Sequence, residues 1–268
     1  MQLFHILALL PIISLDLFAL ADGESNHQFT WFHTLNDSFG NISSLKASDY
    51  YVVAGSDNDQ CIVFHNYFSL EEKETFTDAN DDIKDVDMCE HGFFILAVDV
   101  SGKARVYEEN DDYEFDLIQT ITTDSFGDTS AAYAGAISND HKNIFFGKES
   151  GEVYQYCYNG SKYEYKTTIA DPVGAISSIS LKKSKLAIGE NGNSVYIYDV
   201  IRSGNTLVQT ITLNSTNWIK THLDYVSEKD DDYHHSQRNG DVDEEYYLTI
   251  WSPADSYVLI YKEEDGQF

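Results

Sequence analysis

The sequence predicts an all-β fold made of five similar sheets, and two observations lead to this prediction. The first is a pair of apolar strands around a polar turn, which occurs five times along the chain. The second is composition: 42% of the 268 residues are hydrophobic and 14% are aromatic, although 45 acidic residues face only 17 basic ones. A chain this long and this apolar can bury a substantial core and is not a disordered acidic tail.

Each repeated segment ends in an aromatic residue. The five segments are YYVVAGSDNDQCIVF (50–64), FFILAVDVSGKARVY (93–107), NIFFGKESGEVYQY (143–156), KLAIGENGNSVYIY (185–198) and YYLTIWSPADSYVLIY (246–261). Their last aromatic residues lie 43, 49, 42 and 63 positions apart, and the longest interval contains an acidic insertion at 228–245. A period of about 40–50 residues is typical of four-stranded propeller blades.

The other two strands of each blade flank the hairpins. Inner strands are expected at 41–47, 83–89, 131–138, 173–181 and 218–226, and outer strands at 73–77, 115–121, 163–169 and 207–213. Several inner strands consist of small residues, as a crowded wall around a central channel requires. The turns Ser101-Gly102, Ser150-Gly151 and Asn191-Gly192 supply residues that tolerate positive φ.

Residues 28–35, QFTWFHTL, have the character of the outer strand that the last unit lacks, because only KEEDGQF follows Tyr261. A strand from the N-terminus in the last sheet would remove exposed edges that invite aggregation. We therefore expect a five-bladed β-propeller with its N-terminal strand closing the last blade, as one domain over 22–268. A chain cut from a longer propeller is the alternative.

The repeat resembles that of WD-repeat β-propellers. Its third unit, 136–156, shows the family's order of a small-residue strand, a Ser-x-Asp turn, an apolar strand and an aromatic-ended strand, and Tyr198-Asp199 stands where the family has Trp-Asp. No Gly-His pair opens a unit, no Trp ends a third strand, and five blades are fewer than the usual seven. The resemblance covers about residues 28–264 and implies protein binding by analogy.

The net charge of −28 excludes some partners. Nucleic acids and anionic membrane surfaces attract Lys and Arg, so neither is an expected partner. A protein or glycan partner is expected instead, bound at the rim loops and top face, and the charge favours basic or carbohydrate-bearing molecules. No cofactor is expected.

The N-terminus resembles a secretory signal. Residues 3–15 are apolar but too short to span a bilayer, and Ala19-Leu20-Ala21 offers the small residues that signal peptidase accepts. Cleavage between Ala21 and Asp22 is predicted, with an uncleaved anchor as the alternative. Because no later apolar run reaches 18 residues, the mature chain is expected to have no transmembrane segment and to be secreted or lumenal.

Four Asn-x-Ser/Thr triplets fit that compartment, with glycans expected on Asn36, Asn41, Asn159 and Asn214. The three cysteines, Cys61, Cys89 and Cys157, are too few for a disulfide scaffold. One disulfide with a free thiol, or three buried thiols, fits the sequence equally well.

No HExxH, GxSxG, P-loop or dinucleotide-binding pattern is present, so a non-enzymatic function is expected. One alternative is a hydrolase similar to five-bladed glycoside hydrolases, which would use Asp85, Asp87 and Asp224 of the inner strands as channel carboxylates. The favoured interpretation is that these are solvated or strand-end acids.

Calcium-dependent adhesion is the other alternative. Asp78, Asn80 and Asp82 alternate as in oxygen-ligand loops, but Ile83 replaces the expected glycine and Cys89 the expected glutamate, so no metal site is assigned. The acidic insertion contains His234 and His235, and it could bind a partner or metal, although a tolerated surface loop is favoured.

Overall fold

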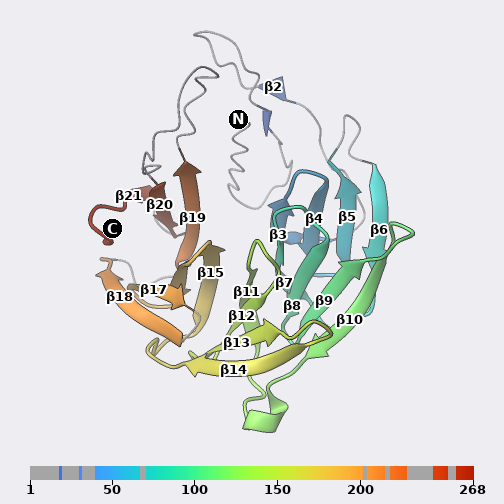
Figure 1. Ribbon diagram of the computed structural model, residues 1–268. Coiled ribbons are helices and arrows are strands. Elements are labelled where there is room, and N and C mark those ends of the chain that lie inside the picture. The colour runs from blue at the N-terminus through green and yellow to red at the C-terminus, as the bar shows by residue number, and fades with distance from the viewer. Residues whose placement is uncertain are drawn as a thin grey trace.

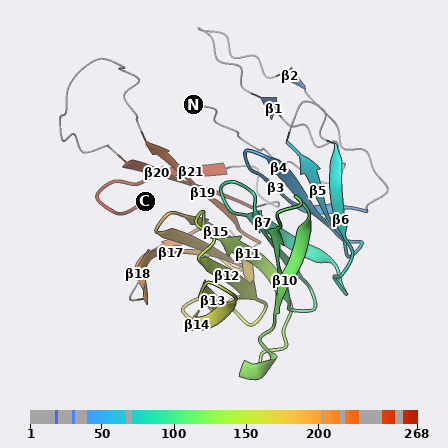
Figure 2. The ribbon, with the colours of Figure 1, turned by 45° about the vertical axis from the view of Figure 1, so that its right-hand side comes forward.

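The computed structural model describes residues 40–66, 71–201, 204–214, 218–227, 244–252 and 258–268, and two short strands near the N-terminus. Five antiparallel sheets stand in a ring, as Figures 1 and 2 show, and this confirms the predicted five-bladed β-propeller. Within the described ranges there is no α-helix; one 3-10 turn, η1 (Asp124–Phe126), projects from the ring.

Each sheet is a meander of consecutive strands, numbered here as blades 1 to 5. The strands of blades 1 and 2 are β3 (Ile42–Ala47), β4 (Tyr51–Ser56), β5 (Cys61–His65), β6 (Glu72–Phe76), β7 (Ile83–Met88), β8 (Phe94–Asp99), β9 (Ala104–Glu109) and β10 (Phe115–Ile121). Blades 3 and 4 contain β11 (Ala132–Ile137), β12 (Asn143–Lys148), β13 (Val153–Tyr158), β14 (Tyr163–Ile169), β15 (Ile176–Lys182), β16 (Lys185–Glu190), β17 (Ser194–Ile201) and β18 (Gly204–Thr212). Blade 5 contains β19 (Lys220–Ser227), β20 (Glu244–Trp251) and β21 (Val258–Lys262).

The first strand of each blade is the innermost, so the ring has two distinct faces. We call the face where these inner strands begin the entry face, and the face where they end the exit face. Connections between blades lie on the entry face, whereas the turns between first and second strands lie on the exit face. Four of the five inner strands carry a β-bulge near their first residue, so the entry end of each is bent in the same way.

Apolar side chains fill the spaces between neighbouring blades. Four buried clusters join blade 1 to 2, 2 to 3, 3 to 4 and 4 to 5, whereas a fifth draws its buried residues from blade 1 alone. Size is matched across these junctions. A Cβ on Gly147 would lie 2.3 Å from Cγ2 of Ile176 in the next blade, and Gly55 faces Ile83 in the same way. At the junction of blades 2 and 3 the larger residue lies on the second strand and the smaller one on the next inner strand: Val98 packs in the same cluster as Ala132.

Polar side chains join the outer parts of the blades. The amide of Gln119 (β10) accepts from the Tyr163 N–H (2.7 Å) and donates to the Tyr163 carbonyl (2.9 Å), so it pairs with the next outer strand as a strand backbone would. Gln209 (β18) makes the same pair of bonds with Phe268. These are the glutamines of the repeated Gln-Thr-Ile triplet, whose recurrence therefore has a structural cause.

The tyrosine that ends a third strand anchors the connection entering its own blade. Tyr107 donates to Asp78 (2.7 Å), Tyr156 to the Thr122 carbonyl (3.4 Å) and Tyr198 to Asp171 (2.7 Å). A buried ring can thus satisfy its hydroxyl at the edge of the core. This contact explains the recurrent tyrosine in blades 2, 3 and 4, whereas Phe64 at the same position of blade 1 has no hydroxyl.

The closure expected from residues 28–35 differs from the structure. The described part of that segment, β2 (Thr30–Trp31), pairs with β1 (Phe18–Ala19), and the rest lies outside the described residues. The sheet of blade 5 contains the three strands named above. The outer-strand character of the segment also permits pairing with another open edge, so it did not fix the partner.

Two smaller expectations can also be compared with the structure. Gly102 and Gly151 use the positive φ that glycine tolerates (86° and 91°), whereas Gly192 does not. Its turn instead makes an isolated bridge between Asn191 and Trp218. The three cysteines are free thiols, which excludes a disulfide among them, but only Cys61 and Cys89 are buried and Cys157 is half-buried, so the arrangement with three buried thiols holds for two of them.

Candidate functional site

The inner strands bring a charged cluster to the axis of the ring. Lys46 (β3), Asp87 (β7) and His222 (β19) hold the same register position in blades 1, 2 and 5, and Asp85 and Asp224 lie two residues away on β7 and β19. We call these five residues the axial cluster. The small residues Ala136 and Ser180 hold that position in blades 3 and 4, so charge lies on one side of the axis.

Asp87 is the centre of the axial cluster. It is buried; its Oδ1 lies 2.7 Å from Lys46 Nζ, and its Oδ2 accepts the N–H of Ile137 in the next blade (2.9 Å). Burial opposes the charge on Lys46, but Asp87, Asp85 and Asp224 together outweigh it, so the pKa of Lys46 is raised. The acids therefore surround a lysine of the chain itself.

Both carboxylate oxygens of Asp85 accept hydrogen bonds within the protein. Its Oδ2 accepts the Gly135 N–H (2.9 Å), while its Oδ1 accepts from Ser44 Oγ (2.7 Å) and the Val86 N–H (3.0 Å). Burial raises its pKa, against the opposing effects of Lys220 and these hydrogen bonds. At the junction of blades 4 and 5, the Ser178 hydroxyl likewise accepts a backbone N–H from the next blade, that of Thr221 (3.0 Å). Asp85 thus holds a position that serves to join adjacent blades.

His222 completes the cluster on blade 5. Its surface reaches solvent at the axis, but protein atoms surround it closely enough that desolvation, with the charges of Lys46 and Lys182, lowers its pKa to about 4. The imidazole is therefore neutral at pH 7. Asp224, two residues further on, accepts the Tyr225 N–H (2.8 Å).

The three acids singled out in the sequence do share the axis, as the hydrolase alternative requires. Glycosidase chemistry, however, needs one protonated carboxyl and one ionised carboxylate that both reach the substrate. Here Asp85 and Asp87 are committed to Ser44, to Lys46 and to backbone amides of the next blade. Asp85 and Asp87 thus join β7 to the inner strands of both neighbouring blades.

An aromatic pair at the entry end of the axis was not expected from the sequence. Tyr133 is the bulged residue of β11 and Trp218 precedes β19; their rings meet edge to face with centroids 5.2 Å apart, and Trp218 is exposed. The contact joins β11 of blade 3 to the segment that leads into β19 of blade 5. A lone aromatic residue within the small-residue strand AAYAGAIS was the signal available in the sequence.

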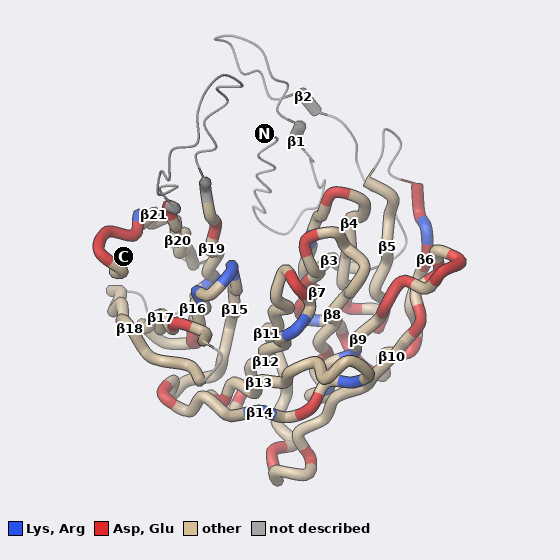
Figure 3. Tube along the Cα trace, viewed as in Figure 1, with Lys and Arg blue, Asp and Glu red and all other residues tan. Residues whose placement is uncertain are grey.

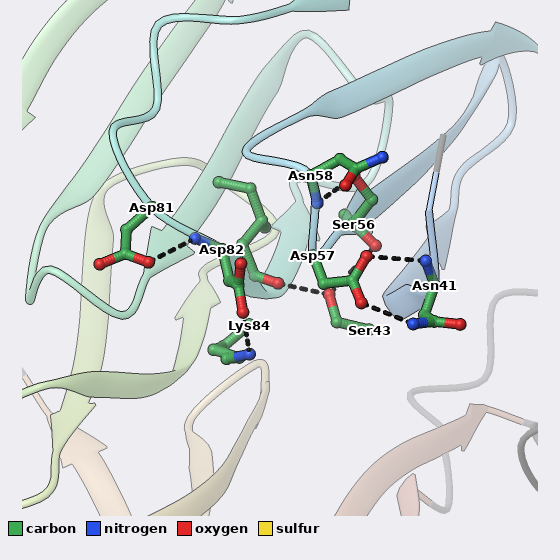
Figure 4. A network of polar contacts seen from close by, with 10 residues as sticks. Asn41, Ser43, Ser56, Asp57, Asn58, Asp81, Asp82 and Lys84 are labelled. Carbon is green, nitrogen blue, oxygen red and sulfur yellow. Dashed lines mark hydrogen bonds and ion pairs between the residues drawn. The ribbon is translucent and has the colours of Figure 1, made fainter. Parts of the chain in front are cut away.

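The acids considered for the calcium alternative have other partners. Asp78 accepts a hydrogen bond from Tyr107 (2.7 Å) and pairs with Arg105 (3.3 Å). Arg105 also forms a buried ion pair with Asp99. Asp59, Asp81 and Asp82 instead place ligand atoms within 4.8 Å of one another. Figure 4 shows Lys84 bonded to Asp82, at 2.9 Å, so this acidic group already has a cation beside it.

The expected glycosylation sites differ in their surroundings. Asn159 lies in an exposed turn, with its Oδ1 accepting from Ser161 and Lys162. Asn41 is exposed, and its Nδ2 donates to Asp57 (2.6 Å), as Figure 4 shows. Asn214 is exposed at the end of the described segment before β19.

Several other predicted sites lie outside the described residues. These are Asn36, the cleavage site at Ala21 and Asp22, and His234 and His235 of the insertion between β19 and β20. Within the described part of the chain, no helix combines the length and apolarity needed to cross a membrane. No known protein family matches the chain, and no curated protein matches it significantly.

Proposed function

We propose that this protein is a non-enzymatic interaction module of the secretory pathway or the extracellular space, which binds a protein or glycan partner on its entry face. The observation that carries the proposal is the Tyr133–Trp218 pair, an exposed aromatic contact at the end of the axis. Aromatic residues with one exposed side are typical anchors of binding surfaces.

The state of the axial acids supports a binding role over catalysis. Asp85 and Asp87 bond to Ser44, Lys46 and backbone amides. The repeat, with tyrosine in place of the WD-repeat tryptophan, supports a distant relation to WD-repeat propellers, and fold analogy alone connects that relation with protein binding.

The test is affinity capture with the mature, secreted chain under crosslinking, followed by identification of the captured molecule. Trp218→Ala is expected to reduce capture at least tenfold. The matched control is Phe126→Ala in η1, which removes an aromatic residue exposed on the same face but distant from the axis. Equal capture by Trp218→Ala and wild type would contradict the proposed surface.

Three further measurements test the compartment and the hydrolase alternative. N-terminal sequencing of the secreted protein should begin at Asp22, and glycosidase treatment should reduce its mass. Turnover of aryl glycosides that is lost in both Asp85→Asn and Asp224→Asn, with unchanged thermal unfolding, would favour the hydrolase alternative over the binding module.

A further inference from the structure

A second aromatic pair lies on the opposite, exit face of the ring. Tyr50, in the turn before β4, stacks on Phe93, in the turn before β8, with centroids 5.9 Å apart and an interplanar angle of 11°. The rings are 42% and 43% exposed. We call this pair the exit-face shelf; it crosses the junction between blades 1 and 2.

The shelf rests on a closely packed support. A Cβ on Gly92, next to Phe93, would lie 2.5 Å from Ser48 Oγ and 2.9 Å from the Tyr51 ring, so the two turns are in direct contact. The N–H of Glu109 also bonds to the Phe93 carbonyl (2.9 Å). The two turns that carry the rings are therefore fixed before any ligand arrives, which reduces the entropy lost on binding.

Ring contacts at other junctions of this face are covered by groups of the chain itself. At the junction of blades 2 and 3, His141 stacks on the buried ring of Phe94 at 4.2 Å. At the junction of blades 4 and 5, Lys183 Nζ lies 3.2 Å above the centre of the Tyr225 ring. Stability of the ring thus does not require an exposed aromatic pair, so the exposure of the shelf calls for another explanation.

The charges around the shelf favour a cation. Asp49 precedes Tyr50 and Glu90 lies in the turn of Phe93, and both acids are exposed. His91 lies beside them, with its Nδ1 3.8 Å from an Asp49 oxygen and its ring 5.9 Å from that of Phe93, whereas within the described residues no Lys or Arg lies over either ring. Figure 3 shows acidic residues in the turns beside β3, β4, β7 and β8. An aromatic face next to carboxylates attracts ammonium and guanidinium groups, and the net charge of −28 brings them closer.

The neighbouring ring already shows this chemistry within the chain. Lys73 Nζ lies 5.5 Å from the centre of the Tyr51 ring and 5.6 Å from that of Phe115, and 3.7 Å from a carboxylate oxygen of Glu109. Lys73 Nζ also donates to the Tyr113 carbonyl, so two rings, a carboxylate and a backbone oxygen together hold this largely buried lysine beside Tyr51, the residue after Tyr50. The shelf presents rings and carboxylates to solvent.

We propose that the exit-face shelf, Tyr50 and Phe93 with Asp49 and Glu90, is a docking site for an Arg- or Lys-bearing segment of a partner protein. It is a second binding surface, independent of the entry-face pair. The cationic group lies over the rings and pairs with the flanking carboxylates.

The experiment measures binding of a fluorescent hexa-arginine peptide to the full mature chain by anisotropy. A Gly-Ser hexamer and cellohexaose serve as uncharged peptide and glycan probes. We expect the arginine peptide to bind at least tenfold more tightly than either. Tyr50→Leu should weaken it about 3- to 10-fold, because the leucine keeps apolar area but lacks the ring quadrupole, whereas Tyr50→Phe should stay within about twofold.

Matched controls lie on the same face. Tyr113, 72% exposed at the rim, is changed to Asn because its φ of 63° suits that residue, and Asp111→Asn is compared with Asp49→Asn. The rim variants and Trp218→Ala should change affinity less than about 1.5-fold, whereas Asp49→Asn should weaken binding about 2- to 3-fold. Thermal unfolding confirms that each variant is folded.

Three results would overturn the proposal. One is binding of the arginine peptide no tighter than the Gly-Ser hexamer. Another is an equal loss in the Tyr113 and Tyr50 variants, which would show nonspecific attraction to the acidic surface. The third is preferential binding of cellohexaose with loss in Tyr50→Leu, which would assign the shelf to a glycan. Failure of the capture experiment on the entry face would not contradict this proposal, because the exit-face shelf is a separate surface.

Discussion

The junctions inside the ring and the outer side of blade 5 are built from the same repeat but differ in burial. The third-strand residues Val63, Val106, Gln155 and Ile197 share one register position and are completely buried. Ile260 holds that position in blade 5 and is 71% exposed, and Val258 beside it is 57% exposed. The repeat therefore places an apolar residue at this position of blade 5 too, but the side chain is buried only where a neighbouring blade and a fourth strand cover it.

The largest expected effect compares Ile197→Ala with Ile260→Ala. The first change opens a cavity between blades 4 and 5 and should cost about 2–5 kcal/mol of unfolding free energy, whereas the second should cost less than about 1 kcal/mol. Chemical denaturation measures both. Similar losses at the two positions would show that a segment such as 28–35 covers Ile260 in solution, as the sequence predicted.

The next effect concerns the matched sizes at the internal junctions. Gly147→Val should destabilise the ring by about 1–3 kcal/mol, because its side chain would overlap Ile176, and Ile176→Ala should also destabilise it by leaving a cavity. The double variant recreates the large-to-small order of Val98 and Ala132. It should lose less than the sum of the two single changes. Additive losses in denaturation would show that the junctions are not interchangeable.

A smaller difference is expected between the two paired glutamines. Gln119→Ala leaves the backbone groups of the buried Tyr163 without partners and should cost about 1–2 kcal/mol. Gln209→Ala does the same to Phe268, which water can reach more easily, so its cost should be below about 1 kcal/mol. The two unfolding midpoints are measured side by side. A larger loss for Gln209 would show that the last blade depends on this contact more than the internal junction does.

The smallest effect concerns the axial cluster where blade 5 faces blade 1. The folded state lowers the pKa of His222 from 6.5 to about 4, so the unfolded chain binds a proton there more readily. Stability attributable to His222 is present above pH 6.5 and is lost as the pH falls towards 4. His222→Gln should therefore flatten the decline in thermal unfolding temperature between pH 6.5 and 5. An unchanged slope would show that water solvates the imidazole fully.

Much of the fold could be predicted because the repeat is local. The strand over 115–121 and that over 163–169 match β10 and β14 in full, since turn residues and alternating apolar positions define a meander strand by strand. The candidate site was predicted in part. Asp85, Asp87 and Asp224 were placed on inner strands, but their bonds to Lys46 and Gly135 depend on residues about 40 and 50 positions away in the sequence.

The sequence by itself determined the five repeated units, their strand order and the acidic character of their connections, because these depend on short-range periodicity and composition. Only the tertiary structure decided which surfaces are available. Phe94 and Phe93 are adjacent, but one is buried under His141 and the other forms an exposed shelf with Tyr50. The physical reason is that exposure and charge pairing depend on what the neighbouring blade places opposite each residue.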